Sequence, residues 1–294
     1  MSDYIKQHTT ICNFNHDDSW VVLSVIEQQI KEKIERIGTP LKDWNIQINY
    51  GIKTGFNDAF IITGEKRKEL IEKDPKSAEI IRPIIRGRDI KRYGYDFADL
   101  YIIATFPSLK INIEDYPSVE QHLLGFGYDR LKQTGETGSR KKTNNKWFET
   151  QDSISYWEDF SKQKIVWKRV GSILRFCFDS EGYYALDSTC FATGKYIKFL
   201  VGFLNSKMGN YLLQDSPKTG TGDLLISVQA IEPIKVPHLT EEQEIVFNDL
   251  IDNILNETSN EKMNEFEIML DDIVFELYNL NNDEISKILS KQSE

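Results

Sequence analysis

The middle of the chain alternates short strand-like segments with polar, glycine-rich loops, and this pattern excludes an all-helical fold. The first such unit is "WNIQINY" followed by "GIKTGFN" and "DAFIIT", where a loop over residues 51–57 joins two expected strands. Glycine and asparagine supply the unusual dihedral angles of a hairpin turn. The same residues, with a lysine and a threonine, also suit a loop that approaches a phosphate or a base. Further strands are expected at "DLYIIAT", "KIVWKRV", "ILRFCFD" and "GYYAL".

Helical periodicity is strongest near the two ends of the chain. Isoleucines recur at helical spacing from Ile26 to Ile37, and Gly38 with Pro40 ends that helix. Two amphipathic helices are expected near the C-terminus, at 240–256 and 261–279. Other helices are expected at 64–74, 118–133 and 196–213. The chain has no internal repeat, so the pattern predicts an α+β fold with an N-terminal connecting helix and a C-terminal helical hairpin.

This organisation predicts three parts. Residues 1–40 form a lead-in and connecting helix, residues 41–239 a mixed domain, and residues 240–294 an acidic helical extension. Within the mixed domain, residues 134–146 ("TGETGSRKKTNNK") contain no apolar side chain, so we expect a loop that is not anchored in a core. "KTGTGD" is a second flexible loop, and two prolines make "IEPIKVPHL" an edge strand.

Charge is distributed very unevenly along the chain. The 294 residues carry a net charge of −10, but residues 223–294 hold 4 basic and 17 acidic side chains. Residues 51–222 hold 27 basic and 22 acidic side chains, and within them residues 130–176 hold 11 and 5. Sign asymmetry between segments is more informative than the total. The middle of the chain is therefore compatible with a nucleic-acid partner despite the acidic whole.

Compartment and membrane signals are simple. No apolar run approaches the roughly 18–20 residues of a membrane span, and the N-terminal sequence lacks the apolar core of a secretory signal. Three cysteines are too few and too scattered for a disulfide framework. We expect a reduced, cytoplasmic protein that does not enter a membrane.

Catalytic and metal-binding motifs are missing from the sequence. It contains no dinucleotide-binding glycine motif, Walker loop or nucleophile elbow, and its acid–x–base triplets give no nuclease signature. His8, Cys12 and His16 have helical ligand spacing, but the threonines and asparagines around them disfavour a helix and no fourth ligand is near. We therefore expect no catalytic residue, metal or cofactor in this chain, and leave open whether it is part of an enzyme.

Four polar, basic stretches favour DNA as the partner. "GIKTGFN", "IRGRDIKRYG", "TGSRKKTNNK" and "SPKTGTGD" each mix lysine or arginine with glycine, serine, threonine or asparagine. These residue types contact phosphates and base edges. Any single stretch is more simply read as a solvated loop, but all four occur in the one segment that is not acidic.

Several motifs in the same order resemble a known family. "DWNIQINYGIKTGFNDAFII", "IIRPIIRGRDIKRY", "KWFE" with "YWEDFSKQKIVWKRV", and "LVGFLNSKMGNYLL" before "IEPIKVPHL" resemble the TaqI-like C-terminal specificity domain. This is the target-recognition domain of type IIG restriction-modification enzymes and related adenine-specific DNA methyltransferases. The recognition domains of type I specificity subunits are more distantly similar. The resemblance runs from about residue 20 to the end of the chain.

The resemblance implies a function that the residues alone leave open. It makes the loop at 51–57 a DNA-contacting signature and implies a double-stranded DNA target-recognition module. Family members carry a methyltransferase domain upstream, with an S-adenosylmethionine site and an (N/D)-P-P-(Y/F/W) motif, and neither motif occurs here. Methylation or cleavage would then need a missing or partner methyltransferase or endonuclease domain, which would bind S-adenosylmethionine. The alternative is a protein-interaction subunit that docks a methyltransferase or motor through its acidic tail.

The expected DNA contacts fall into groups. Phosphate contacts are expected from Lys53, Arg86, Arg88, Lys91, Arg92, Lys168 and Arg169. Base-facing residues are expected to be Arg140, Lys141, Lys142, Asn144, Asn145 and Lys146. The remaining candidates are Thr54, Asn57, Lys218 and Thr219.

Overall fold

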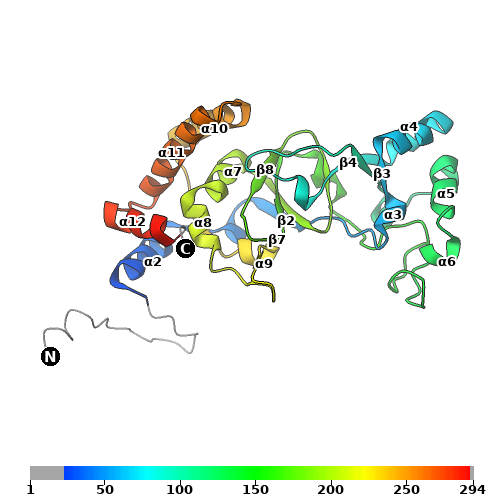
Figure 1. Cartoon of the computed structure of the whole chain (residues 1–294), viewed down its shortest axis with the longest axis horizontal. Helices are drawn as coiled ribbons and strands as arrows, with labels where there is room; N and C mark the ends of the chain where they lie inside the picture. The colour runs from blue at the N-terminus through cyan, green and yellow to red at the C-terminus, as the bar shows by residue number, and fades with distance from the viewer. Residues whose placement is uncertain (1–22, 292–294) are drawn as a thin grey trace, which may run out of the picture. The chain divides into compact units, whose positions relative to one another are not determined.

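A computed structural model describes residues 23–291 of the chain (Figure 1). The candidate ligands His8, Cys12 and His16 lie outside the described residues. The chain divides into two compact units, and each is built from more than one segment of the sequence. Unit 2 comprises residues 45–201 and 216–230, and unit 1 comprises the rest. The structure combines helices with several small sheets, so the predicted α+β class is confirmed.

The first sheet of unit 2 is antiparallel throughout. Its order is β2-β10-β6-β8, which places β2 and β8 at opposite edges. Val166 in β6 faces Phe191 on one side and Cys177 on the other, and all three side chains are buried. The strands are β2 (Ile46–Tyr50), β10 (Thr189–Gly194), β6 (Lys164–Lys168) and β8 (Phe176–Asp179).

The second sheet of unit 2 mixes both strand directions. Its order is β3-β5-β4-β9, and only the β4–β9 pair is parallel. A further two-stranded sheet pairs β7 with β11. The strands are β3 (Ile61–Thr63), β5 (Leu100–Ile103), β4 (Ile81–Ile85), β9 (Tyr184–Ala185), β7 (Val170–Gly171) and β11 (Leu224–Leu225).

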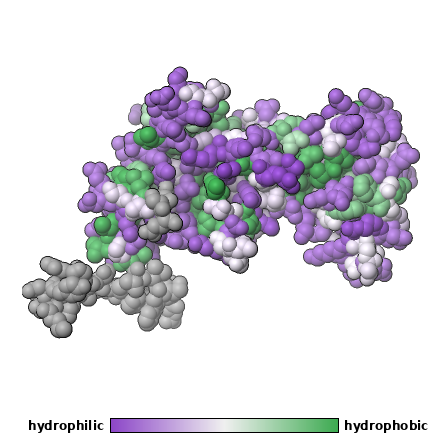
Figure 2. Space-filling view, viewed as in Figure 1, coloured by the Kyte–Doolittle hydropathy of each residue, from purple (hydrophilic) through white to green (hydrophobic). Residues whose placement is uncertain are grey.

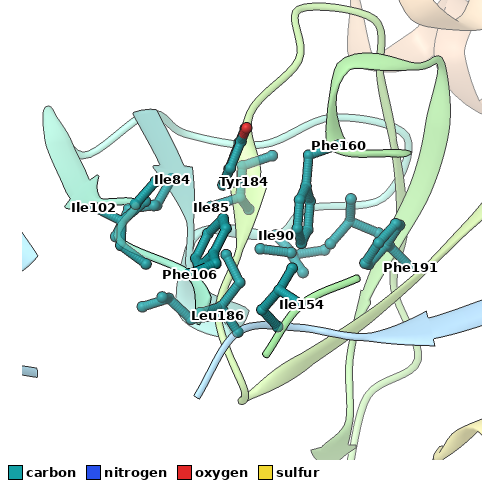
Figure 3. Close-up of a cluster of buried hydrophobic side chains, with 14 of the residues drawn as sticks. Ile84, Ile85, Ile90, Ile102, Phe106, Ile154, Phe160, Tyr184, Leu186 and Phe191 are labelled. Atoms are coloured by element: carbon teal, nitrogen blue, oxygen red, sulfur yellow. The ribbon is translucent and has the colours of Figure 1, made fainter. Parts of the chain in front are cut away.

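An aromatic and aliphatic core fills the space between these strands (Figure 3). The Phe160 ring stacks on Tyr184 with a centroid distance of 4.5 Å and lies 4.6 Å from the Phe191 ring. Ile154 and Leu186 are members of the same cluster. Polar residues that line the surface lie next to both in the sequence. The core therefore holds the backbone of these surface segments in place.

A buried ion pair joins two strands of the first sheet. Lys164 donates to Asp179, and both side chains are fully buried. Lys164 also donates to the Phe160 carbonyl at 2.5 Å, and Asp179 accepts from the Tyr95 hydroxyl at 2.7 Å. Burial lowers the pKa of Lys164, and the Asp179 carboxylate opposes that shift. One lysine of the basic middle segment therefore serves the interior rather than the surface.

Unit 2 also contains short helices, and two segments of it differ from the predicted secondary structure. The expected helix at 118–133 is broken between α5 and α6, where Gly127 has a φ of +92°. The first part of "DAFIIT" is helical, so only Ile61–Thr63 forms a strand. Figure 2 shows hydrophilic side chains over the charged α4. The helices are α3 (Asn57–Phe60), α4 (Gly64–Lys73), α5 (Pro117–Leu124) and α6 (Tyr128–Leu131).

The expected helix at 196–213 is also two helices, α7 (Ile197–Asn205) and α8 (Lys207–Leu213). The side chain of Ser206 caps α8 by accepting from the Gly209 backbone amide, so a new helix starts there. The division between the two units falls within α7 and again within the short α9 (Val228–Ile231).

Unit 1 is mainly helical and brings distant segments together. The strand pair β1–β12 aligns Thr39 with Val236, and Lys33 of α2 forms an ion pair with Glu284 at 2.6 Å. The prediction assigned the connecting helix and the acidic tail to separate domains, whereas both lie in unit 1. Its elements are α2 (Val25–Ile37), β1 (Thr39–Pro40), α8, β12 (Lys235–Val236), α10 (Glu241–Asn256), α11 (Asn260–Leu277) and α12 (Asn282–Lys291).

Candidate nucleic-acid interface

The loop at residues 51–57, here called the signature loop, is held on both sides by backbone hydrogen bonds. The Ile52 amide donates to the Ala185 carbonyl at 2.7 Å, and the Asp187 amide donates back to Ile52 at 2.9 Å. On the other side, the Asp152 amide donates to the Lys53 carbonyl at 3.2 Å. A Cβ atom on Gly51 would lie 1.9 Å from the Leu186 carbonyl oxygen. The loop therefore runs as an extended segment between two neighbours, and Gly51 is needed for the close approach.

Lys53, Thr54 and Asn57 have different surroundings within this loop. Lys53 and Asn57 are exposed, whereas Thr54 is buried. The Thr54 hydroxyl donates to the Asn57 side-chain oxygen at 2.6 Å and accepts from the Phe56 amide at 3.1 Å. This corrects the expected contact from Thr54, because its side chain is used to shape the turn that presents Lys53 and Asn57.

An open pocket of about 560 Å³ lies beside Lys53. Its wall combines two cations, two carboxylates, two amides and two phenol rings. It is lined by Tyr50, Gly51, Lys53, Thr143, Asn145, Gln151, Asp152, Ser153, Ile154, Ser155, Tyr156, Arg169 and Asp187. The pocket thus gathers residues from all the segments that flank the signature loop.

The two carboxylates of the pocket are those of Asp152 and Asp187. Neither Asp152 nor Asp187 forms an ion pair in the part of the chain that the structure describes. Burial raises the pKa of Asp152, while the Lys53 backbone and charge act in the opposite direction. Both carboxylates are half-buried, so they remain open to a hydrogen-bond donor that enters the pocket.

One residue that lines the pocket, Ile154, has a strained backbone conformation. Ile154 is 2% exposed and has a φ of +49°, which is rare for a β-branched residue. Hydrogen bonds hold this segment: the Ser108 hydroxyl donates to the Ile154 carbonyl at 2.8 Å, and the Tyr156 hydroxyl donates to the Tyr50 carbonyl at 2.9 Å. Such strain concentrates at functional sites because the surrounding structure must maintain it.

Arg140 anchors the loop at 134–146, which corrects two predictions. Its side chain is 2% exposed and lies over the Phe60 ring, 5.1 Å from the centroid. The guanidinium donates to four backbone carbonyls at 2.6–3.0 Å, those of Leu131, Thr54, Glu149 and Trp147. Burial, with help from the Arg130 charge, lowers its pKa to about 10, so it stays charged at neutral pH. Arg140 therefore does not face bases, and the loop is tied to the interior.

The other residues of this loop are divided between surface and support. Lys141, Lys142, Asn144 and Lys146 are exposed, and their contact with DNA stays a prediction. The Asn145 side-chain amide donates to the carbonyls of Thr150 and Gln151, each at 3.0 Å. Its nitrogen is thus committed to the loop, and only its oxygen remains for the pocket.

A second group of cations adjoins the pocket through Ser188. The Gly87 amide donates to the Ser188 hydroxyl at 3.2 Å, and the Arg169 amide donates to the Ser188 carbonyl at 3.0 Å. Lys168 and Arg88 are exposed here. Arg86 is different, because it makes a two-point contact with Asp89 at 2.7 and 2.9 Å and so stabilises its own turn.

Lys91 and Arg92 lie at the other edge of the first sheet. Lys91 forms an ion pair with Asp96 at 3.0 Å, and the Arg92 guanidinium lies 5.4 Å from the centre of the Tyr93 ring. Tyr93 exchanges backbone hydrogen bonds with β8, which is the edge strand opposite β2. These two cations are therefore separated by the sheet from the strand that leads into Lys53.

The loop at 216–223 is connected to Arg169. The Ile226 amide donates to the Arg169 carbonyl at 2.8 Å, next to the β7–β11 pair. Lys218 is exposed, and the Thr219 amide donates across the loop to the Asp223 carbonyl at 2.8 Å. The signature loop and the loop at 134–146 therefore contact each other directly through Arg140, whereas the stretches at 85–94 and 216–223 are connected to this region through Ser188 and the β7–β11 pair.

The family comparison agrees with this geometry. Residues 82–225 match the TaqI-like C-terminal specificity domain. The chain carries a TaqI-like C-terminal specificity domain. This matched range contains most of the pocket lining, while Lys53 precedes it. The comparison with curated proteins found no match.

Two solved structures resemble the chain that carries this specificity domain. One is the type IIL restriction-modification enzyme MmeI, solved in complex with DNA, with 14% identity over 86% of this chain and a TM-score of 0.55. The other is the type IIG restriction endonuclease BpuSI, with 14% identity over 86% of this chain and a TM-score of 0.46. The chain spans 36% and 33% of their lengths. The similarity to MmeI shows that this chain shares its fold with part of that enzyme.

The prediction from sequence did not include several residues that line the pocket beside Lys53. Gln151 and Asp152 lie five and six residues after the end of the basic loop, so proximity to that loop was the available signal. Tyr50 directly precedes the signature loop, so adjacency was again the available signal, whereas Asp187 is distant in sequence from both loops and has no local signal. Across residues 23–291, no cluster of three or more potential ligands suits a metal ion, and no helix has the length and apolar character to span a membrane.

Proposed function

We propose that this chain is a sequence-specific double-stranded DNA recognition module of a restriction-modification system. The observation that carries the proposal is the pocket beside Lys53, which is lined by residues of two basic, polar stretches, 51–57 and 137–146, together with Arg169. The specificity-domain match supports the same conclusion. The mixed chemistry of the pocket wall suits base edges, while the exposed cations around it suit phosphates.

Two sets of exposed residues divide the work. Lys53, Arg88 and Lys168 neutralise phosphates and position the duplex, and they carry no sequence information. Lys141, Lys142 and Asn144 extend from a loop that Arg140 holds, so they reach bases with little loss of conformational entropy. Because α10 and α11 contain 11 acidic residues and one lysine, they are unsuited to contact DNA.

Catalysis in this scheme belongs to a separate or missing domain. The sequence has no methyltransferase motif, so this chain selects the site while a partner domain binds S-adenosylmethionine and methylates an adenine, or cleaves nearby. An enzyme must extrude a base to modify it, and that step needs the catalytic pocket of the partner domain.

The test measures binding of the purified chain to random duplex DNA at two salt concentrations, followed by sequencing of the retained pool. We expect enrichment of one short motif. Lys53→Ala should weaken binding to all sequences alike and reduce the salt slope by about one, whereas Asn144→Ala should change the enriched motif. Lys68→Ala is the control, because Lys68 is an exposed lysine of α4 that forms no ion pair with any residue from 23 to 291. Identical behaviour of the Lys53 and Asn144 variants would refute the division of roles.

A further inference from the structure

The carboxylates of the pocket are unusual on a surface that binds DNA. Phosphates repel carboxylates, so negative side chains on such a surface oppose binding unless they meet a hydrogen-bond donor. Asp152 and Asp187 nevertheless line the same pocket as Lys53 and Arg169. Neither carboxylate forms an ion pair among residues 23–291, so no salt bridge gives either of them a structural role.

The backbone around both carboxylates holds them in place. The Asp152 amide donates to the Lys53 carbonyl and the Asp187 amide donates to the Ile52 carbonyl, so the two residues flank the signature loop from opposite sides. Leu186, which precedes Asp187, and Ile154, two residues after Asp152, are both anchored in the core (Figure 3). Both side chains therefore project from rigid backbone, as specificity-determining residues require.

We propose that Asp152 and Asp187 select a base with an exocyclic amino group, cytosine or adenine, at one position of the target. This inference rests on the proposed function. A carboxylate only accepts hydrogen bonds. In the major groove, cytosine N4 and adenine N6 are donors, whereas guanine O6 and thymine O4 are acceptors that a carboxylate repels. Lys53 and Arg169 then bind the flanking phosphates and offset the repulsion that the two carboxylates add.

Isosteric amide variants test this directly. Asp152→Asn and Asp187→Asn keep an acceptor and add a donor, so they should accept all four bases more evenly. We expect discrimination at one target position to fall by about tenfold or more, with preference elsewhere unchanged. The matched control is Glu158→Gln, which removes an exposed charge from the same unit but does not line the pocket. Thermal unfolding of each variant verifies that the fold is intact.

Modified duplexes identify the amino group. Once the motif is known, replacing adenine by purine, or cytosine by 2-pyrimidinone, removes the exocyclic amine without changing the rest of the base. The wild-type chain should lose affinity for one of these duplexes at the critical position, and the asparagine variants should lose much less. The base that responds tells adenine from cytosine.

Distinct results would overturn the inference. If both asparagine variants bind every sequence more tightly and keep the wild-type motif, the carboxylates only repel DNA and the selection of an amino group is wrong, while the proposed function stands. If the wild-type chain binds DNA with no preference at any salt concentration, the proposed function fails and this inference fails with it.

Discussion

Two polar loops of unit 2 have different supports. Residues 134–146 and 216–223 are both rich in glycine and threonine and carry lysine. The first is tied to the interior by the buried Arg140 guanidinium, which joins it to Thr54 of the signature loop. The second is closed by short-range bonds, such as Thr219 to Thr221 at 2.8 Å. One long side chain directed inward therefore makes a polar loop part of the core.

The largest effect is expected from Arg140→Ala. Four backbone carbonyls would lose their donor, and buried unsatisfied acceptors cost about 1–3 kcal/mol each, so we expect unfolding free energy to fall by about 3 kcal/mol or more. Arg140→Lys should rescue little of this, because an ammonium group lacks the planar fork of donors. Urea unfolding measures the loss. Full rescue by lysine would show that charge rather than geometry holds the loop.

A smaller effect is expected from Asn145→Ala. Its side-chain amide serves the carbonyls of Thr150 and Gln151, so removal should lower the unfolding free energy by about 1–2 kcal/mol. The neighbouring Asn144→Ala is the natural control, because that exposed side chain should change stability by less than about 0.5 kcal/mol. Hydrogen exchange of the amides at 143–152 should increase only for the Asn145 variant. Equal effects on exchange would remove the distinction between support and surface.

The smallest effect on stability is expected from Lys218→Ala in the second loop. This exposed lysine has no ion pair in the described part of the chain, so the unfolding free energy should change by less than about 0.5 kcal/mol. DNA affinity should fall for all sequences, with the salt slope smaller by about one. A loss of stability similar to that of the Arg140 variant would mean that both loops depend on buried anchors.

The fold class was predictable because helical and strand periodicity are local properties. The expected helices at 26–37 and 240–256 match α2 and α10 closely. α12 was missed, because its short sequence follows a run of asparagines and has few apolar residues. The helix breaks at Ser206 and Gly127 depend on capping and on one positive φ angle, which compete with an otherwise continuous apolar pattern.

The candidate site was predictable only in part. Lys53 and Asn144 are exposed as expected, but Arg140 and Lys141 are adjacent basic residues that face in opposite directions. The distinction depends on which carbonyls lie beneath the loop, and residue type carries no such information. Asp152 and Asp187 line one pocket because the signature loop passes between their two segments, a tertiary arrangement with no local signal.

The composition of unit 1 from separate stretches has a consequence for synthesis on the ribosome. Thr39 cannot pair with Val236 until the intervening segment has been made, which at 5–20 residues per second takes roughly 10–40 s. Most of unit 2 emerges during that interval and can fold first. The apolar face of α2 meanwhile remains without its partner helix α12, so this helix stays exposed during synthesis for longer than the segments of unit 2.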